Sequence, residues 1–199
     1  LRVLVLMGGV SAEHAISLRS AEAVTKGLER LGHQVLTVAI SKTGQWLAGD
    51  MAGLLAEAAH QLVEVPPDAG RAVTLAPAGT GAGGHLLYLD GGKEKREDLD
   101  LAFPVLHGPG GEDGSIQGLF ETMGIPFVGA GSAASAIAMD KLLMKTMAAG
   151  AGIDQVEFMS AGDDDTVALC GRIETAFGFP CFVKPAALGS SVGITKVEA

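Results

Sequence analysis

The fold class is decided by the stretch Arg2-Val-Leu-Val-Leu-Met-Gly-Gly9 near the start of the chain. Valine and leucine face both sides of this apolar run, and two glycines follow it at once, a pattern typical of a parallel strand that feeds a helix. Small and apolar residues then recur at helical spacing over 17–31, and Gly32 supplies a stop signal. The sequence therefore predicts an α/β fold.

Strand and helix signals continue to alternate along the rest of the chain. The pattern predicts further strands over 35–40, 99–106, 126–128, 156–159, 179–184 and 192–197, and helices over 51–62, 115–123, 132–149 and 163–177. Prolines and glycines interrupt the periodicity over 66–92, which indicates a loop or β-ribbon insertion. Alternation restarts beyond 129–152 with a fresh first strand, so we expect two domains, residues 1–130 and 131–199.

Composition narrows the class of protein. Of the 199 residues, 48% are apolar, which is enough to bury a core, and the net charge of −9 disfavours a nucleic-acid surface. Cys170 and Cys181 are too few and too far apart for a disulfide framework or a zinc site, so we expect two core residues in a reducing compartment. No apolar run approaches about twenty residues, which predicts no membrane span and a cytoplasmic location.

A carboxylate and an imidazole follow the first strand, in Gly8-Gly-Val-Ser-Ala-Glu13-His14. Ligands of open α/β sheets bind beyond the carboxyl ends of the strands, which makes Glu13 a candidate binding residue. The alternative is an acid favoured only by the dipole of the following helix. His14 by itself indicates a structural role.

A second polar loop follows a later strand and reads His107-Gly-Pro-Gly-Gly-Glu-Asp-Gly114. His107 is a candidate for substrate positioning, because functional side chains concentrate on such loops. The alternative is a tight turn capped by Glu112 and Asp113. None of these residues shows the spacing of a metal site.

A third loop, Lys184-Pro-Ala-Ala-Leu-Gly-Ser-Ser-Val-Gly-Ile194, joins two predicted strands. Its glycines, exposed amides and two hydroxyls suit an anionic group, and Lys184 adds a point charge. A hairpin turn of small residues is the alternative. Helical periodicity, in contrast, predicts that Lys141 is an ordinary solvated lysine.

One motif points to a different class of protein. The residues Gly129-x-Gly131-x-x-Ala134 match the relaxed dinucleotide-binding fingerprint. The preceding strand is short, however, and the nearest acid at the required distance, Asp154, precedes a strand instead of following one. Close backbone packing is the simpler role of these glycines, and a dinucleotide-binding oxidoreductase remains an alternative.

Six motifs taken together resemble bacterial D-alanine-D-alanine ligases of the ATP-grasp superfamily. In chain order they are Gly8-Gly-x-Ser-x-Glu-His14, His107-Gly-x-x-Gly-Glu-Asp-Gly114, Val128-Gly-x-Gly131, Met139-Asp-Lys141, Val183-Lys-Pro185 and Gly189-Ser-Ser-Val-Gly193. The resemblance covers essentially the whole chain. It implies an N-terminal open parallel, Rossmann-like (preATP-grasp) domain, followed by the first part of an ATP-grasp domain.

The resemblance also implies an activity, the ATP-dependent joining of two D-alanines through an acyl phosphate for peptidoglycan synthesis. ATP, Mg²⁺ and D-alanine would be the ligands, and a homodimer the assembly. Glu13 would hold the ammonium of the first D-alanine, with His107 close to the same substrate and Ser190 bonded to the network of Glu13. The groups that would contact the phosphates of ATP are Lys141, Lys184, Gly189 and Ser191.

The family's magnesium-binding carboxylates and its transition-state arginine have no counterpart in this sequence. We therefore expect a fragment of a longer enzyme that is inactive by itself, with the metal ligands outside the chain. The choice between D-alanine, D-lactate and D-serine as acceptor would depend on the same missing half. A folded module that requires a partner or its missing half is the alternative of a different class.

Overall fold

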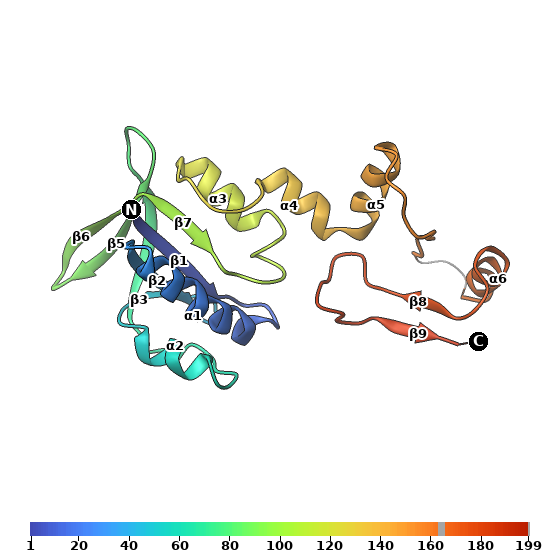
Figure 1. Cartoon of the computed structure of the whole chain (residues 1–199), viewed down its shortest axis with the longest axis horizontal. Coiled ribbons are helices and arrows are strands. Elements are labelled where there is room, and N and C mark those ends of the chain that lie inside the picture. Colours follow the sequence, from blue (N-terminus) through green and yellow to red (C-terminus); the bar gives the residue numbers. More distant parts are fainter. Residues whose placement is uncertain (163–165, 199) are drawn as a thin grey trace. The chain divides into compact units, whose positions relative to one another are not determined.

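The computed structural model describes residues 1–162 and 166–198, which divide into two compact units, Leu1–Ala136 and Ile137–Ala199. Figure 1 labels the elements of both units. The elements of the first unit, with α4 crossing its boundary, are β1 (Arg2–Gly8), α1 (His14–Arg30), β2 (Gln34–Ile40), β3 (Trp46–Ala48), α2 (Ala52–Ala58), β4 (Arg71–Pro77), β5 (Gly84–Asp90), β6 (Lys93–Leu99), β7 (Leu101–Pro104), α3 (Ser115–Met123) and α4 (Ser132–Met139). Those of the second are α5 (Lys141–Gly150), α6 (Thr166–Ala176), β8 (Cys181–Val183) and β9 (Thr195–Val197).

The first unit is built on one mixed sheet of seven strands in the order β6-β5-β4-β3-β2-β1-β7. Strands β2, β1 and β7 pair in parallel, which confirms the predicted α/β class. Strands β3 to β6 add an antiparallel meander to one side of the sheet. Two of them, β4 and β5, lie in the 66–92 insertion, which is therefore a β-ribbon that extends the sheet. The predicted strand over 99–106 is divided at Asp100, because Leu99 still pairs with β5 as the end of β6 whereas Leu101–Pro104 pairs with β1 as β7.

Helices cover both faces of the parallel strands, with α1 and α2 on one face and α3 on the other (Figure 1). The residues of β1 alternate between the two cores. Leu4 and Leu6 pack with Ile116 and Phe120 of α3, whereas Val5 and Met7 pack with Leu18 and Ala21 of α1, among others. A strand buried on both faces explains why its sequence is continuously apolar.

His14 lies at the start of α1 and is only 1% exposed. Its Nε2 atom accepts from the Val65 backbone N–H at 3.1 Å, so Nδ1 carries the proton and donates to the Gly9 carbonyl at 2.6 Å. The ring therefore ties the first turn of α1 to the segment after α2. The structural role predicted for His14 agrees with these contacts.

Replacing His14 with leucine is expected to destabilise the chain by about 2–4 kcal/mol. The change leaves the buried Val65 N–H without an acceptor and the Gly9 carbonyl without its ring donor, and unmade buried hydrogen bonds are costly. Urea unfolding of the 199-residue chain measures the effect through the fluorescence of Trp46, its single tryptophan. His60→Leu, at an exposed histidine, is the control. Equal loss in both variants would contradict the structural role.

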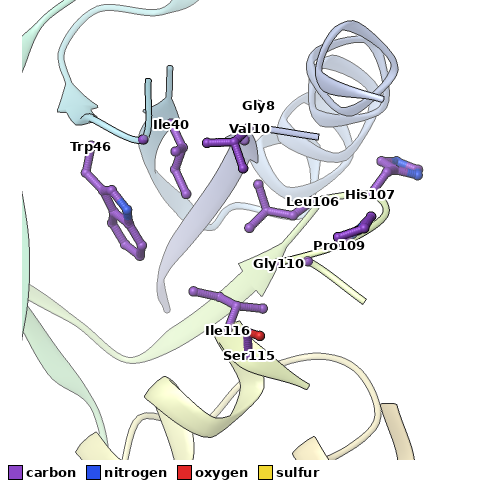
Figure 2. A pocket seen from close by; sticks show the side chains of 13 residues that line it. Gly8, Val10, Ile40, Trp46, Leu106, His107, Pro109, Gly110, Ser115 and Ile116 are labelled. Atoms are coloured by element: carbon purple, nitrogen blue, oxygen red, sulfur yellow. The ribbon is translucent and has the colours of Figure 1, made fainter. Parts of the chain in front are cut away.

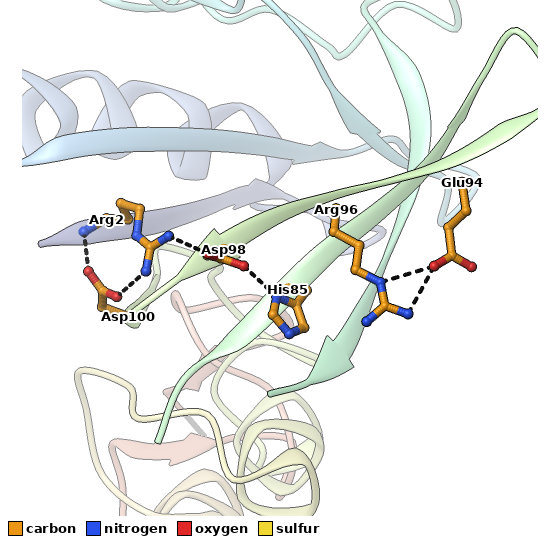
Figure 3. Close-up of polar contacts among 6 residues, drawn as sticks. All are labelled: Arg2, His85, Glu94, Arg96, Asp98 and Asp100. Carbon is orange, nitrogen blue, oxygen red and sulfur yellow. Dashed lines mark hydrogen bonds and ion pairs between the residues drawn. The ribbon is translucent and has the colours of Figure 1, made fainter. Parts of the chain in front are cut away.

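Ion pairs join the first strand to the end of β6 (Figure 3). The Arg2 guanidinium contacts the carboxylates of Asp98 and Asp100, each at 2.8 Å. The Nδ1 atom of His85 lies 2.8 Å from the other oxygen of Asp98. Hydrogen bonds from Arg2 hold the pKa values of both Asp98 and Asp100 below their usual range.

The ion pairs of Arg2 are expected to stabilise the chain at neutral pH and not in acid. A carboxyl group with a lowered folded-state pKa contributes its full stability above its unfolded pKa of about 4, and loses it as the pH falls through the folded value. Arg2→Gln should therefore lower the urea midpoint at pH 7, and the difference from wild type should shrink below about pH 4. Arg96→Gln, whose partner Glu94 lies on the same strand, is the control. A difference that grows in acid would show that the sign is wrong.

The second unit differs from the sequence expectations at several points. Instead of one helix over 132–149, α4 and α5 are separated at Asp140, which is extended and whose side chain accepts from the N–H groups of Leu142 and Leu143. No strand forms over 156–159, where the Lys145 ammonium bonds the Val156 carbonyl and lies over the Phe158 ring. Side-chain contacts from α5 therefore take the place of a strand ladder.

Smaller corrections concern burial and boundaries. None of the described residues of the second unit is buried, and Cys170 is exposed on α6, so the expectation that it is a core residue is wrong. Cys181 is only partly buried, because the described residues of the second unit form no buried core. The stretch 126–128 makes one isolated bridge, Ala102 to Phe127, instead of a strand. The predicted helix start at Asp163–Asp165 lies outside the described residues. In the described part of the chain, no helix is both long enough and apolar enough to cross a bilayer.

Candidate functional site

Two polar loops meet at the carboxyl ends of β1 and β7. The segment 9–13 follows β1, and the segment 105–114 follows β7. Because these strands are parallel neighbours, their outgoing loops emerge at the same edge of the sheet. The sequence placed Glu13 on the first loop and His107 on the second, and the fold brings the two loops together.

The hydroxyl of Ser11 connects the two loops. It donates to the His107 carbonyl at 2.8 Å and accepts from the Glu13 backbone N–H at 3.2 Å. On the outer side, the Lys42 ammonium donates to the Ser11 carbonyl at 2.8 Å. The sequence predicts no role for Ser11, because a serine in a glycine-rich loop carries no signal of what it contacts.

The carboxylate of Glu13 lies against the second loop. A β-carbon at Gly108 would come within 2.8 Å of Glu13 Oε2, and Gly108 has the left-handed φ of +70°. The side chain of Glu13 does not cap α1. Its position therefore favours a role facing the loop of His107 over one confined to the helix terminus.

The two acids of the second loop brace its backbone. Glu112 Oε2 accepts from the Gly108 N–H at 2.7 Å, and Asp113 accepts from Gly110 at 2.8 Å and from Ser115 at 3.0 Å. Partial burial raises the pKa of Asp113, but the hydrogen bonds from Gly110 and Ser115 outweigh it, so the pKa lies below its usual value. Glu112 and Asp113 thus cap the turn, as the structural alternative for this loop proposed, and they hold the segment that carries His107.

A pocket of about 280 Å³ opens beside these loops (Figure 2). Its walls are mainly apolar and include Ile40, Trp46, Leu106 and Ile116, with His107 at one side. Glycines of both loops also line it, which allows a ligand to approach the backbone closely. His107 is among the residues that line the pocket, but its ring points away from the apolar side chains in Figure 2.

The phosphate-loop candidates lie in the second unit, where β8 and β9 form an antiparallel pair joined by residues 184–194. This confirms the predicted strand-loop-strand arrangement. The alternative, a hairpin turn of small residues, predicts the same strand pairing. Ser190 and Ser191 have φ values of 48° and 60°, in the left-handed region that side chains rarely adopt. Strained residues of this kind concentrate at ligand-binding loops.

Two lysines flank the same loop. Lys141 is the first residue of α5, and its ammonium donates to the Leu188 carbonyl while its backbone N–H donates to Ala186 at 2.9 Å. The prediction of an ordinary solvated lysine is therefore incomplete, since Lys141 anchors the loop. Lys184 directly follows β8, and its ammonium lies 5.9 Å from the centroid of the Phe182 ring.

These features define the α/β class in which an open Rossmann-like domain precedes a domain of the ATP-grasp type. The family profile described as "D-ala D-ala ligase N-terminus" matches residues 2–130, and the one described as "D-ala D-ala ligase C-terminus" matches residues 147–199. The chain belongs to the D-alanine-D-alanine ligase family.

Individual relatives agree with this assignment. The D-alanine--D-alanine ligase of Bacillus cytotoxicus is 39% identical over 197 residues, which cover 97% of this chain and 52% of that protein. The one of Paenarthrobacter aurescens is 41% identical over 207 residues, covering 100% of this chain and 53% of that protein. The chain thus spans about half the length of the curated relatives it matches.

Solved structures give the same result. The D-alanine-D-alanine ligase of Coxiella burnetii superposes with a TM-score of 0.82 at 33% identity, covering 100% of this chain and 57% of that chain. The VanG D-Ala:D-Ser ligase of Enterococcus faecalis superposes with a TM-score of 0.78 at 30% identity, covering 100% and 55%. Both similarities extend over both units of the fold.

Proposed function

We propose that the full-length protein that carries this sequence joins two D-alanines at the expense of ATP. The observation that carries the proposal is the Glu13 carboxylate, which lies against Gly108 in the loop of His107 at the carboxyl edge of the sheet. A carboxylate in that position suits the ammonium of an amino acid, because an ion pair in a partly buried site supplies both affinity and orientation. Membership of a family whose relatives are named for D-alanine supports the choice of substrate.

The proposed reaction has two steps. The carboxylate of the first D-alanine attacks the γ-phosphorus of ATP, and the bond to ADP breaks to leave an acyl phosphate. The amine of the second D-alanine then attacks the acyl carbon, loses a proton and displaces inorganic phosphate. Glu13 and His107 would hold the first D-alanine during both steps, so that its carboxylate keeps one orientation towards the nucleotide.

The second unit supplies the groups proposed for ATP. The ammonium groups of Lys141 and Lys184 would balance the charge of the phosphates, and Gly189 and Ser191 would donate to phosphate oxygens. Ser190, in the same loop, would be a substrate-binding hydroxyl. Magnesium ions accompany ATP in phosphoryl transfer, and the described residues contain no cluster of three or more His, Cys, Asp or Glu side chains that could bind one.

The product would serve peptidoglycan synthesis in the cytoplasm, and the assembly would be a homodimer. The acceptor is proposed as D-alanine because the curated relatives from Bacillus cytotoxicus and Paenarthrobacter aurescens carry that name, although the Enterococcus faecalis relative is named for D-serine. Competition between D-alanine and D-serine in the assay below would distinguish the two acceptors.

The proposal is tested by phosphate release from ATP with the full-length protein and Mg²⁺. Release should depend on D-alanine, should not occur with L-alanine, and should accompany a product with the mass of the dipeptide. Phosphate release that ignores D-alanine, or no release from a folded protein that binds ATP, would reject the proposed reaction.

A further inference from the structure

We propose that Ser11 is a positioning residue that sets the distance between Glu13 and the loop of His107. The inference rests on the proposed function, because it gives Ser11 a role in holding the first amino-acid substrate. The hydroxyl lies between the two loops and is bonded to both of them.

The Ser11 hydroxyl both donates and accepts a hydrogen bond. Serine has one donor and can accept through its lone pairs, so the bond to the His107 carbonyl uses its proton and leaves it free to accept from the Glu13 N–H. Each hydrogen-bond partner is a backbone group of a residue that is proposed to bind the substrate. A change at Ser11 therefore acts on Glu13 and His107 together, without removing either side chain.

The loop on the far side of this contact is braced internally. Glu112 Oε2 accepts from the Gly108 N–H at 2.7 Å, which holds the shape of the turn that follows His107. A β-carbon at Gly108 would lie 2.8 Å from Glu13 Oε2 and 3.4 Å from the β-carbon of Ser11. The loops are already in contact, and small shifts at Ser11 become shifts of the Glu13 carboxylate.

Ser17, on α1, provides a matched comparison. Its hydroxyl accepts from the Gly8 N–H at 2.8 Å and donates to the Val105 carbonyl at 2.6 Å. It therefore joins the last residue of β1 to the chain just after β7, but it is fully buried and its hydroxyl bonds are to neither Glu13 nor His107. Ser17 represents a bridging serine with a purely structural role.

The experiment uses the full-length protein with Ser11→Ala, Ser11→Thr and Ser17→Ala. Ser11→Ala removes both hydrogen bonds of the hydroxyl and is expected to raise the KM for D-alanine about tenfold or more, since each such bond contributes about 0.5–1.5 kcal/mol. The Kd for ATP should stay the same. Ser11→Thr keeps the hydroxyl and should restore most of the affinity, whereas Ser17→Ala should lower the melting temperature and leave the KM unchanged.

Amide hydrogen exchange gives a readout that is independent of turnover. Exchange over 9–13 and 107–112 should rise in Ser11→Ala and be restored in Ser11→Thr. A Ser11→Ala protein that has lost stability but keeps the wild-type KM and exchange would overturn the inference while the proposed function stands. A wild-type protein without D-alanine turnover would overturn the proposed function, and the positioning role with it.

Discussion

Glu13→Gln is expected to lower kcat/KM for D-alanine by about 30-fold or more, with the Kd for ATP unchanged. Removing one partner of a desolvated charge pair costs about 2–5 kcal/mol, and each 1.4 kcal/mol is a factor of ten. Glutamine keeps nearly the same shape, so the contact with Gly108 can remain while the charge that would face the ammonium is lost. The D-alanine dependence of phosphate release, measured in the full-length protein at saturating ATP, gives the ratio.

The matched control is Glu29→Gln, at an exposed acid on the same helix. It removes the same charge at the other end of α1 and should leave kcat/KM unchanged. Equal losses in the two variants would assign the effect to net charge and not to the site. Unchanged kinetics in Glu13→Gln would remove Glu13 from the proposed binding residues.

The parallel core of the first unit can be predicted because its signals are local. Strand β1 is apolar at each position from Val3 to Met7, and the spacing of the α1 residues gives the face that packs on it. The segment directly after the 66–92 insertion shows the limit. Strand β6 reads Lys93-Glu-Lys-Arg-Glu-Asp-Leu99, with no apolar alternation, because it is an edge strand exposed to water and its pairing with β5 comes from the backbone.

The candidate site could be predicted only in part, because sequence patterns report local structure and not contacts between distant loops. The sequence identifies Glu13 and His107 as polar residues after strands, since that position depends on local pattern alone. Residues that act by touching another loop leave no such pattern. Ser11 bonds a carbonyl 96 residues away, and the Lys141 ammonium bonds one 47 residues away. Helical periodicity predicts a solvated position for Lys141 because it reflects only the spacing of residues along one helix. It does not report the contact of the Lys141 ammonium with the Leu188 carbonyl.

Lys184→Met is the second change with a large expected effect, an increase of about 10- to 100-fold in the Kd for ATP. Hydrogen bonds to a charged group contribute about 1.5–3 kcal/mol, and the ammonium of Lys184 is proposed to contact a phosphate. Its observed contact is with the Phe182 ring, which is weak at an exposed site and leaves the ammonium able to turn towards an anion. Methionine keeps the length and apolar stem of the side chain, so the loop itself should persist.

Titration calorimetry of the full-length protein with magnesium-ATP measures the change, and Lys196→Met is its control. Lys196 carries the same charge on β9, where its ammonium pairs with Glu198 at 2.6 Å. Loss of ATP affinity in Lys184→Met alone would support a direct phosphate contact, whereas equal losses would indicate a general effect of charge.

Lys141→Met tests a different effect, because the Lys141 ammonium also donates a hydrogen bond to the Leu188 carbonyl and so anchors the loop. Removing it should weaken ATP binding and raise hydrogen exchange over 186–191, while Lys184→Met should change the affinity with no change in exchange.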